Sequence, residues 1–438
     1  LERGDDALPA KKSTSVRLPL PERARLRVTL WEAEPLELCA LARAEHSNTA
    51  LEWTQAALGR GDDGGANVVV RQAPFTPGVH RVGKPSLDGL PGFLADSLPD
   101  SWGRLLIDRQ LRAAGVLPNT LSGFDRLAIV GHRGPGALVF EPEIPLSKVQ
   151  HDKIDLDSLA QSAEVLLKGR DPELLDCLAQ AGGSAGGSRP KAWIAEGSDG
   201  VLRSGARLLN NGETGWLVKF RAPAHDPEDI GVLEFAYAQM AIAAGLEVAK
   251  PRLFEAPKGC YFGSQRFDRH GSRRVHVLTA AALLNVPPEQ AMAADYVDLL
   301  KLTRFVTRSE AEVVEAFRLA AFNVLAHNRD DHLKQFAFRR IDGVWRRTPA
   351  YDLVFNEGPR GEHTLLVAGE GRRPKAQHLE RLADLAGVKP KVAHGVIDQV
   401  RHAVSGWPSL AREAGLSAKT ANHVAAHLAQ LKDQFIQF

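Results

Sequence analysis

The feature that most constrains the fold is a polar loop held between a helix pattern and a hairpin pattern. Residues 309–327 place apolar side chains at helical spacing, and Ser309 and Glu312 form a capping-box pattern at the start of this segment. The polar loop 328–335 follows at once. Two alternating segments then flank Asp342-Gly343, a dipeptide that favours a two-residue β-hairpin turn. A helix is therefore expected to deliver a polar loop to one end of a lobe, with a hairpin beside it.

The register of this hairpin predicts that three oxygen-bearing side chains meet. If the dipeptide forms the turn, Gln335 lies opposite Ala350, so Gln335 and Asp352 approach each other at the open end, near Asp330. Phosphoryl transfer uses one carboxylate to orient a hydroxyl group and oxygen ligands to hold magnesium on phosphates. The spacing from Asp330 to Gln335 matches the kinase pattern D-x-x-x-x-N with glutamine at its last position, and Tyr351-Asp352-Leu353 takes the place of D-F-G. The alternative is an Asp-rich solvated loop beside an ordinary hairpin.

A glycine-rich segment earlier in the chain is a second candidate for phosphate binding. Four glycines within residues 182–191 precede Lys191 and let the backbone approach phosphate groups, although a flexible connector accounts for them equally well. The Walker A pattern is absent. Lys219 lies on an alternating strand, where it could pair with phosphates or simply be exposed, and Glu234 on the following helix could pair with Lys219. Glycine loop, strand lysine, helix, polar loop and second aspartate follow in the order that kinases require.

The remaining pattern predicts an α+β, two-lobed, protein-kinase-like fold. We expect a tail at 1–24, a mixed α/β N-terminal subdomain at 25–145, an ATP-binding kinase lobe at 146–275 and a mainly α-helical catalytic lobe at 276–438. The segment 131–136 has the order GxxGxG with an internal proline, so we interpret it as a turn and not as a nucleotide loop. Strands are expected at 26–31, 67–71, 137–140, 192–194 and 216–220, and helices at 101–115, 156–168, 172–181, 226–246, 376–387, 389–405 and 418–436.

Composition excludes several classes of protein. The chain is 44% hydrophobic and 25% charged, with no apolar run long enough to span a bilayer and no signal segment, so we expect a cytoplasmic protein with no membrane partner. The net charge of +2 argues against a surface that clamps nucleic acid on all sides. Cys39, Cys177 and Cys260 lie far apart without a CxxC pair or a His cluster, which predicts reduced packing residues and neither a disulfide framework nor a zinc site.

The combination of segments resembles the HipA family of serine/threonine protein kinase toxins from HipBA-like type II toxin–antitoxin systems. The resemblance rests on Ser184-Ala185-Gly186-Gly187-Ser188-Arg189-Pro190-Lys191, Arg266-Phe267-Asp268-Arg269, Asn328-Arg329-Asp330-Asp331-His332 and Pro349-Ala350-Tyr351-Asp352, and it extends to Leu98-Pro99-Asp100-Ser101 and Gly123-Phe124-Asp125. It implies a kinase that uses ATP and Mg²⁺ to phosphorylate a protein, typically an aminoacyl-tRNA synthetase. It also implies a HipB-like DNA-binding antitoxin, through which the chain would meet operator DNA.

The resemblance further implies a role for each matching position. Asp330 takes the position of the catalytic aspartate, Asp352 and Gln335 those of the metal ligands, and Ser184 that of a serine whose autophosphorylation expels the glycine loop and inactivates the kinase. A doubly charged phosphate within a phosphate-binding loop would repel ATP. The implied ATP-binding positions are Gly186, Gly187, Ser188, Arg189, Pro190, Lys191, Lys219, Gln265, Arg266, Phe267, His332 and Tyr351.

Gln335 departs from the family pattern, which has asparagine at this position. The additional methylene changes the reach of the amide oxygen, and magnesium tolerates poor octahedral geometry badly. Two alternatives therefore stay open. One is a catalytically weak HipA-like co-repressor that acts with its antitoxin on operator DNA, and the other is a different enzyme, such as a nuclease, that uses the same acidic metal site. Dependence on ATP separates the nuclease from the kinase.

Overall fold

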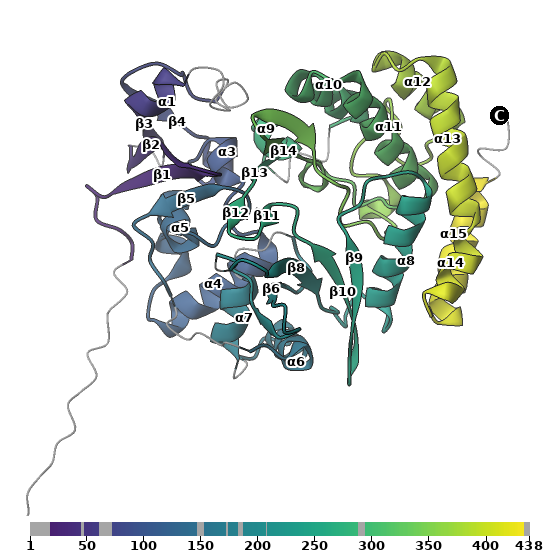
Figure 1. Cartoon of the computed structure of the whole chain (residues 1–438), viewed down its shortest axis with the longest axis horizontal. Coiled ribbons are helices and arrows are strands. Elements are labelled where there is room, and N and C mark those ends of the chain that lie inside the picture. Colours follow the sequence, from purple (N-terminus) through teal and green to yellow (C-terminus); the bar gives the residue numbers. More distant parts are fainter. Residues whose placement is uncertain are drawn as a thin grey trace, which may run out of the picture.

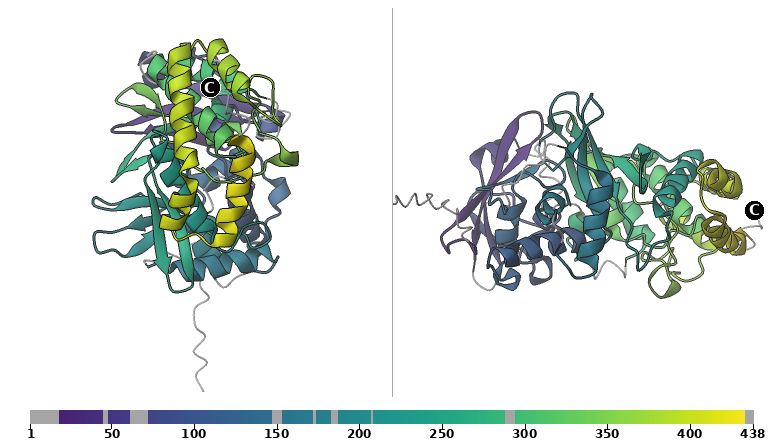
Figure 2. Two further views of the ribbon diagram at one scale, coloured as in Figure 1. Left: turned by 90° about the vertical axis from the view of Figure 1, so that its right-hand side faces the viewer. Right: turned by 90° about the horizontal axis from the view of Figure 1, so that it is seen from below.

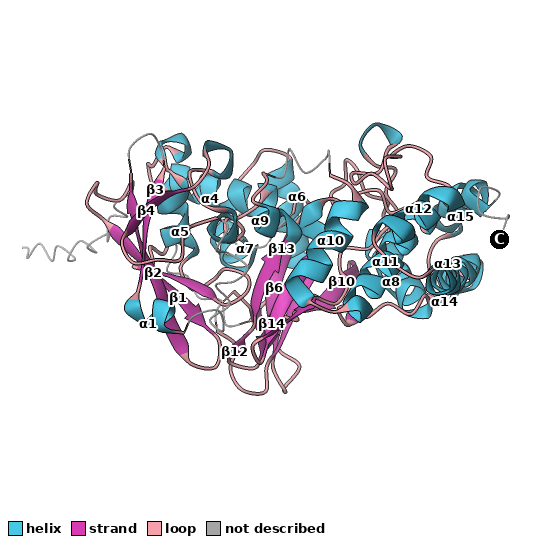
Figure 3. Ribbon diagram, turned by 90° about the horizontal axis from the view of Figure 1, so that it is seen from above, coloured by secondary structure: helices cyan, strands magenta, loops and turns pink. Residues whose placement is uncertain are grey.

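The computed structural model describes residues 18–44, 48–60, 72–146, 153–171, 174–182, 187–206, 208–287 and 294–432. These residues form two five-stranded sheets, a three-stranded sheet and a helical region toward the C-terminal end (Figure 1). Strands gather in one part of the molecule and helices dominate the other end (Figure 3). The predicted α+β class with a helical C-terminal lobe is thereby confirmed. The strand predicted at 67–71 lies outside the described residues, and the predicted domain boundaries stay predictions.

The first sheet lies in the N-terminal region and is antiparallel throughout. Its strand order is β4-β3-β2-β1-β5. Apolar side chains of its strands pack on short helices, and Ser122 and Asp125 form a reciprocal capping box at the start of one of them, α5. Residues 131–136 form turns and bends before β5, as predicted. The elements of this region are β1 (Arg25–Trp31), β2 (Pro35–Arg43), β3 (Thr49–Trp53), α1 (Gln55–Gly59), β4 (Val79–Val82), α3 (Gly92–Ala95), α4 (Ser101–Ala113), α5 (Gly123–Val130) and β5 (Leu138–Glu141).

The second sheet carries the strand lysine and is also antiparallel. Its order is β7-β6-β8-β10-β9. Trp216, Val218 and Phe220 pack into a core with α4, α6 and α7, so the alternation predicted for this strand is correct and Lys219 faces away from that core. Cys39 and Cys177 are buried, as predicted for packing residues, whereas Cys260 near the start of β10 is exposed, so the prediction is wrong for that residue. The elements are α6 (Leu156–Leu167), α7 (Leu175–Gly182), β6 (Lys191–Glu196), β7 (Leu202–Ser204), β8 (Thr214–Lys219), β9 (Pro251–Ala256) and β10 (Gly259–Gln265).

One helix connects the second sheet with the helical region. Helix α8 (Ile230–Ala243) is shorter than the predicted 226–246, and nearly all of its side chains are at least half-buried because the helix is covered on several sides. One side of α8 contacts β9 and β10, and another contacts the C-terminal helices α13 and α14, whose bounds are given below. The Tyr237 hydroxyl donates a 2.8 Å hydrogen bond to the backbone oxygen of Ala326, and its ring packs edge-on against Trp407.

The third sheet contains the predicted hairpin. Strands β14 (Ala337–Ile341) and β15 (Val344–Arg347) pair in register Ile341 to Val344, and both residues of the Asp342-Gly343 turn have positive φ angles, 49° and 81°. A third strand, β13 (His276–Thr279), pairs with β14. The sequence prediction of a mainly helical lobe at 276–438 missed β13, and no strand was predicted for the short pair β11 (Arg269–His270) and β12 (Arg273–Arg274). Strands of two to four residues give too few positions for a recognisable alternation.

The C-terminal helices stack along one end of the molecule (Figure 2). Ser309 caps α11 through its side chain, as predicted, but Glu312 does not complete a capping box, because its carboxylate binds Arg347 at 3.2 Å. In the described part of the chain, no helix is both long and apolar enough to cross a membrane. The helices are α9 (Ala280–Leu284), α10 (Tyr296–Thr307), α11 (Glu310–Leu325), α12 (Ala376–Leu385), α13 (Pro390–Ser405), α14 (Trp407–Glu413) and α15 (Ala418–Lys432).

Candidate active site

A cavity of about 200 Å³ lies between the second sheet, the hairpin and the polar loop. Apolar side chains such as Trp193, Leu217 and Phe262 form part of its wall. Most of the predicted site residues line it: Gly187, Lys191, Lys219, Gln265, Arg266, Phe267, His332, Gln335, Tyr351 and Asp352. Ser188, Arg189, Pro190 and Asp330 are not part of this lining, and Ser184 and Gly186 lie outside the described residues. The fold therefore brings together segments from both lobes, as the order of motifs predicted.

A chain of buried ion pairs forms the polar end of the cavity. Lys219 Nζ lies 2.8 Å from Glu234 Oε1 and also contacts the Asp352 carboxylate. Arg189 binds the same Glu234 oxygen at 3.4 Å and Asp226 Oδ1 at 3.1 Å. Lys219 is thus buried and paired, which excludes the exposed strand lysine that was its alternative. The predicted pairing of Lys219 with Glu234 is confirmed.

The charges around Asp352 keep it ionised. Burial alone would raise the pKa of Asp352, but Lys219, Lys191 and Arg189 outweigh burial and hold the pKa well below its ordinary value. Burial likewise would lower the pKa of Lys219, and Asp352 with Glu234 raises it above its ordinary value. Lys191 is the exception, since burial lowers its pKa despite the nearby Asp352. The site therefore presents a carboxylate and at least one ammonium group in fixed positions.

Gln335 and Asp352 meet at the open end of the hairpin, as the register predicted. The Gln335 amide nitrogen donates a 2.7 Å hydrogen bond to Asp352 Oδ2, and Asp352 itself has a positive φ of 57°. Few residues other than glycine adopt this backbone conformation, so the surrounding contacts determine it. The donor set fits magnesium, because the Asp352 carboxylate and the amide oxygen of Gln335 can supply oxygen ligands. The amide must rotate first, since its nitrogen now faces the carboxylate.

The two adjacent aspartates of the polar loop differ completely in environment. Asp331 is fully buried and accepts hydrogen bonds from Tyr296 Oη at 2.7 Å, Thr364 N at 2.7 Å and His363 Nδ1 at 2.8 Å. The Asp330 side chain is 51% exposed, and His332 Nε2 lies 3.9 Å from its Oδ1. Loss of hydration raises the pKa of Asp330, while the His332 ring opposes the rise. Asp331 therefore holds the loop in place, and Asp330 is the carboxylate available to a substrate.

Asp100 connects the glycine-rich segment with the polar loop and was missed by sequence reasoning. Its Oδ2 accepts a 2.8 Å hydrogen bond from Gly187 N, and its other oxygen contacts Lys334 Nζ. The backbone of Gly187 has φ 95°, and a Cβ there would lie 2.4 Å from Lys191 Nζ. The sequence pattern indicates only a polar cap of α4 at Asp100, but no cap hydrogen bond from its side chain forms. Only the family resemblance of residues 98–101 offered a signal.

The predicted ATP-binding segment 265–267 offers an aromatic ring to the cavity, while its arginine is held by the protein. Arg266 is buried, donates to both oxygens of Asp268 at 2.8 Å and stacks over the Trp193 ring at 4.0 Å. Its guanidinium is thus committed to these contacts. Phe267 instead packs against Tyr351, with ring centroids 5.6 Å apart, and both rings line the cavity. The apolar surface for a flat ring comes from these aromatic side chains and not from Arg266.

Comparison with known proteins identifies relatives over most of the chain. The HipA N-terminal domain model matches residues 27–141, and the HipA-like C-terminal domain model matches residues 183–407. Over 126 residues the chain is 29% identical to the "Putative kinase Y4mE" of Sinorhizobium fredii (strain NBRC 101917 / NGR234), a match that covers 26% of this chain. This match spans 30% of the length of that relative.

The fold has a counterpart among solved structures. A chain in the complex of the Shewanella oneidensis MR-1 toxin–antitoxin proteins HipA and HipB with operator DNA aligns with a TM-score of 0.67 and 18% identity. The alignment covers 94% of this chain and 98% of that chain, which confirms the predicted two-lobed HipA-like fold. The Helicobacter pylori kinase CtkA aligns over 50% of this chain and 94% of its own, with 12% identity and a TM-score of 0.32, and supports no conclusion.

Proposed function

This chain belongs to the HipA family, and from that premise we propose that it is an ATP- and Mg²⁺-dependent serine/threonine protein kinase that acts as the toxin of a HipBA-like pair. The observation that carries the proposal is the contrast between the two aspartates of the polar loop. Asp331 is fixed by buried donors, whereas Asp330 is left accessible, next to His332 and close enough to Asp352 and Arg189 to experience their charges. A solvated Asp-rich loop would not need one of its aspartates locked in this way.

Each side chain then has a defined task in phosphoryl transfer. Lys219, held by Glu234, would exchange its contact with Asp352 for the nucleotide phosphates. Asp352 and the rotated amide of Gln335 would hold Mg²⁺, which when bound neutralises the negative charge of the phosphates. Asp330 would orient the serine hydroxyl of the substrate and accept its proton, and its raised pKa favours that acceptance at the end of transfer.

The partners proposed for the chain rest on family membership. We propose a HipB-like DNA-binding antitoxin as the inhibitor, and operator DNA as a partner reached mainly through that antitoxin. The aligned Shewanella oneidensis structure is a complex of HipA, HipB and operator DNA, which supports this assignment. The proposed substrate is a protein serine, typically in an aminoacyl-tRNA synthetase, and Ser184 is the proposed site of self-inactivation.

Phosphate transfer to the chain itself provides the first test. Dephosphorylated protein is incubated with ATP and MgCl₂, beside an Asp330→Asn variant, and analysed by mass spectrometry for phosphate on Ser184 or Ser188. Phosphate on the wild type alone supports the kinase assignment and the self-inactivation together. If neither protein gains phosphate and neither transfers it to lysate proteins of a sensitive bacterium, the kinase assignment is wrong.

The hydrogen bond from Gln335 to Asp352 favours a second candidate, a catalytically weak co-repressor. The longer side chain directs its amide nitrogen at the carboxylate, and this contact competes with a metal ion. A Gln335→Asn variant, which restores the family residue, separates the two. If the variant gains transfer activity from an inactive wild type while operator binding with the antitoxin is equal for both, the natural protein acts as a co-repressor.

A further inference from the structure

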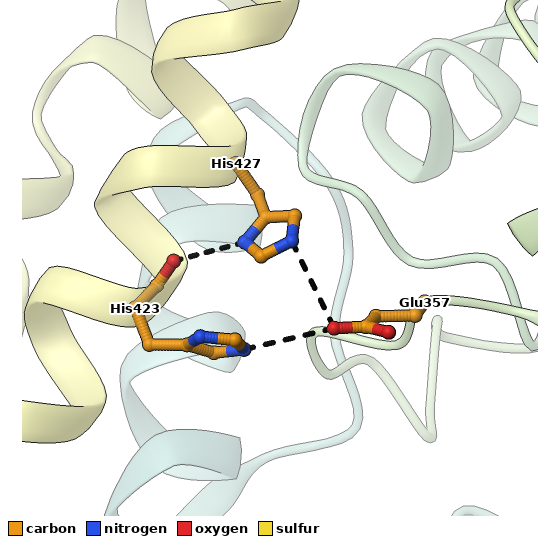
Figure 4. Close-up of side chains that lie close together, drawn as sticks. All are labelled: Glu357, His423 and His427. Carbon is orange, nitrogen blue, oxygen red and sulfur yellow. Dashed lines mark hydrogen bonds and ion pairs between the residues drawn. The ribbon is translucent and has the colours of Figure 1, made fainter.

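Three side chains outside the lining of the cavity form a compact cluster, two of them on the C-terminal helix α15. His423 and His427 lie one turn apart on the same face of α15, and both rings point toward the Glu357 carboxylate (Figure 4). The Nε2 atom of each histidine lies 3.8 Å from Glu357 Oε1. The ligand atoms of all three residues lie within 4.8 Å of one another. From this geometry we propose that Glu357, His423 and His427 bind a divalent transition-metal ion of the zinc class.

The distances suit such an ion. Zinc bonds to histidine nitrogen and carboxylate oxygen are about 2.0–2.2 Å long, so ligand atoms around a tetrahedral ion are separated by about 3.3 Å. Closing the present 3.8 Å separations to this value needs only small side-chain rotations. Two imidazoles and a carboxylate favour zinc or a neighbouring first-row metal over magnesium, which prefers oxygen ligands. The site belongs chemically to a different class from the oxygen-rich cavity, and it departs from the sequence expectation, drawn from the cysteine spacing, that the chain has no zinc site.

The orientation of one ring is the one that metal binding requires. His427 Nδ1 lies 3.0 Å from the backbone oxygen of His423, and because a carbonyl only accepts, Nδ1 carries the hydrogen. In the neutral ring, Nε2 then directs its lone pair at the Glu357 carboxylate. A backbone acceptor on the far nitrogen is the support that metal-binding histidines usually have. A cation between the two facing acceptors would relieve their repulsion.

The surroundings leave room for further ligands. The side chains of His423 and Glu357 are 55% and 63% exposed, and that of His427 is 26% exposed. Three protein ligands with solvent on the open side leave at least one coordination position for water. Phe355 closes the inner side, with ring centroids 5.3 Å from His423 and 5.0 Å from His427.

The cluster joins two parts of the chain that are close to the polar loop. Asn356 N donates to His327 O at 3.0 Å, and Arg329 N donates to Asn356 O at 3.3 Å. Glu357 therefore directly follows Asn356, whose backbone pairs with His327 and Arg329 just before Asp330. An ion at the cluster would fix the middle of α15 to this pairing. The first turn of α15 is held separately by Thr420 Oγ1, which donates a hydrogen bond to Asp229.

Calorimetric titration of the full chain tests the site. Tag-free protein is treated with EDTA, dialysed and titrated with ZnSO₄ in excess MgCl₂, which occupies oxygen-rich sites. We expect one saturable zinc site with micromolar or tighter affinity, and a weakening of at least about 100-fold in His423→Ala and in His427→Ala. Saturating zinc should raise the melting temperature of the wild type by at least about 2 °C, and Co²⁺ should give a visible absorption spectrum that both variants lose.

Matched variants distinguish this cluster from other histidines and from the cavity. His394→Ala removes an exposed histidine of α13 that pairs with Glu380 of α12 at 3.1 Å. This variant should bind zinc as the wild type does. Asp352→Asn should also retain the site, which separates it from the cavity. Circular dichroism confirms that each variant is folded. Zinc binding of wild-type strength in His423→Ala, or the lack of saturable zinc binding below millimolar concentration in the wild type, would overturn the proposal.

Discussion

Replacing Asp331 with alanine removes the shared acceptor of four buried donors, of which Leu365 N is the most distant at 3.4 Å. Tyr296 Oη, Thr364 N and His363 Nδ1 all donate to this carboxylate at 2.7–2.8 Å, and the Asp331 side chain is fully buried. Each buried donor that loses its partner costs about 1–3 kcal/mol, and local rearrangement recovers part of this. We therefore expect Asp331→Ala to lower the free energy of unfolding by about 3–5 kcal/mol.

The adjacent residue supplies the control for this prediction. Asp330 is half exposed, so Asp330→Ala should change the free energy of unfolding by no more than about 0.5 kcal/mol. Both variants are unfolded in urea and followed by circular dichroism and tryptophan fluorescence, with Asp331→Asn as a variant that retains one amide oxygen as acceptor. Equal unfolding midpoints for Asp330→Ala and Asp331→Ala would refute the distinction between a structural and an accessible aspartate.

Three further predictions concern the cavity and the pH dependence of stability. Asp352→Ala should abolish Mg²⁺-dependent nucleotide binding, measured by calorimetry with and without EDTA, whereas a wild-type affinity would contradict the metal assignment. Asp100→Ala should weaken ATP binding about tenfold through the loss of its contacts with Gly187 and Lys334, while an unchanged affinity would exclude a positioning role. Burial lowers the pKa of His276 to about 3, and Arg340 adds to this effect, so below about pH 6.5 the unfolded chain binds a proton that the folded chain does not. The contribution of His276 to the free energy of unfolding should therefore be retained at high pH and should fall by about 1.4 kcal/mol between pH 7.5 and 5.5. In urea unfolding measured across this range, His276→Gln should remove this part of the pH dependence.

Local signals in the sequence were sufficient for the elements that shape the site. The Asp342-Gly343 turn fixes its register through its own backbone preference, and the register then determines that Gln335 meets Asp352. The alternation around Lys219 likewise determined which side chains enter the core. These predictions succeeded because each depends on residues that are close in sequence.

Contacts between distant segments could not be predicted in the same way. Asp100 lies 87 positions from Gly187 and 234 positions from Lys334, so its part in the site follows only from the packing of the N-terminal region on both lobes. Glu312 satisfied a local capping rule in the sequence, but Arg347 on the hairpin competed for its carboxylate.

The contacts of Asp100 and of its neighbour Asp96 make the N-terminal region part of the architecture of the candidate active site. Asp96 accepts hydrogen bonds from the backbone and hydroxyl of Thr279 on β13, while Asp100 reaches the glycine-rich segment and the polar loop. Asp96 and Asp100 themselves also line the cavity. A fragment that begins after residue 145 would therefore lack one wall of this cavity. Two separate family models match the two parts of the chain, but side chains from both parts enclose a single candidate site.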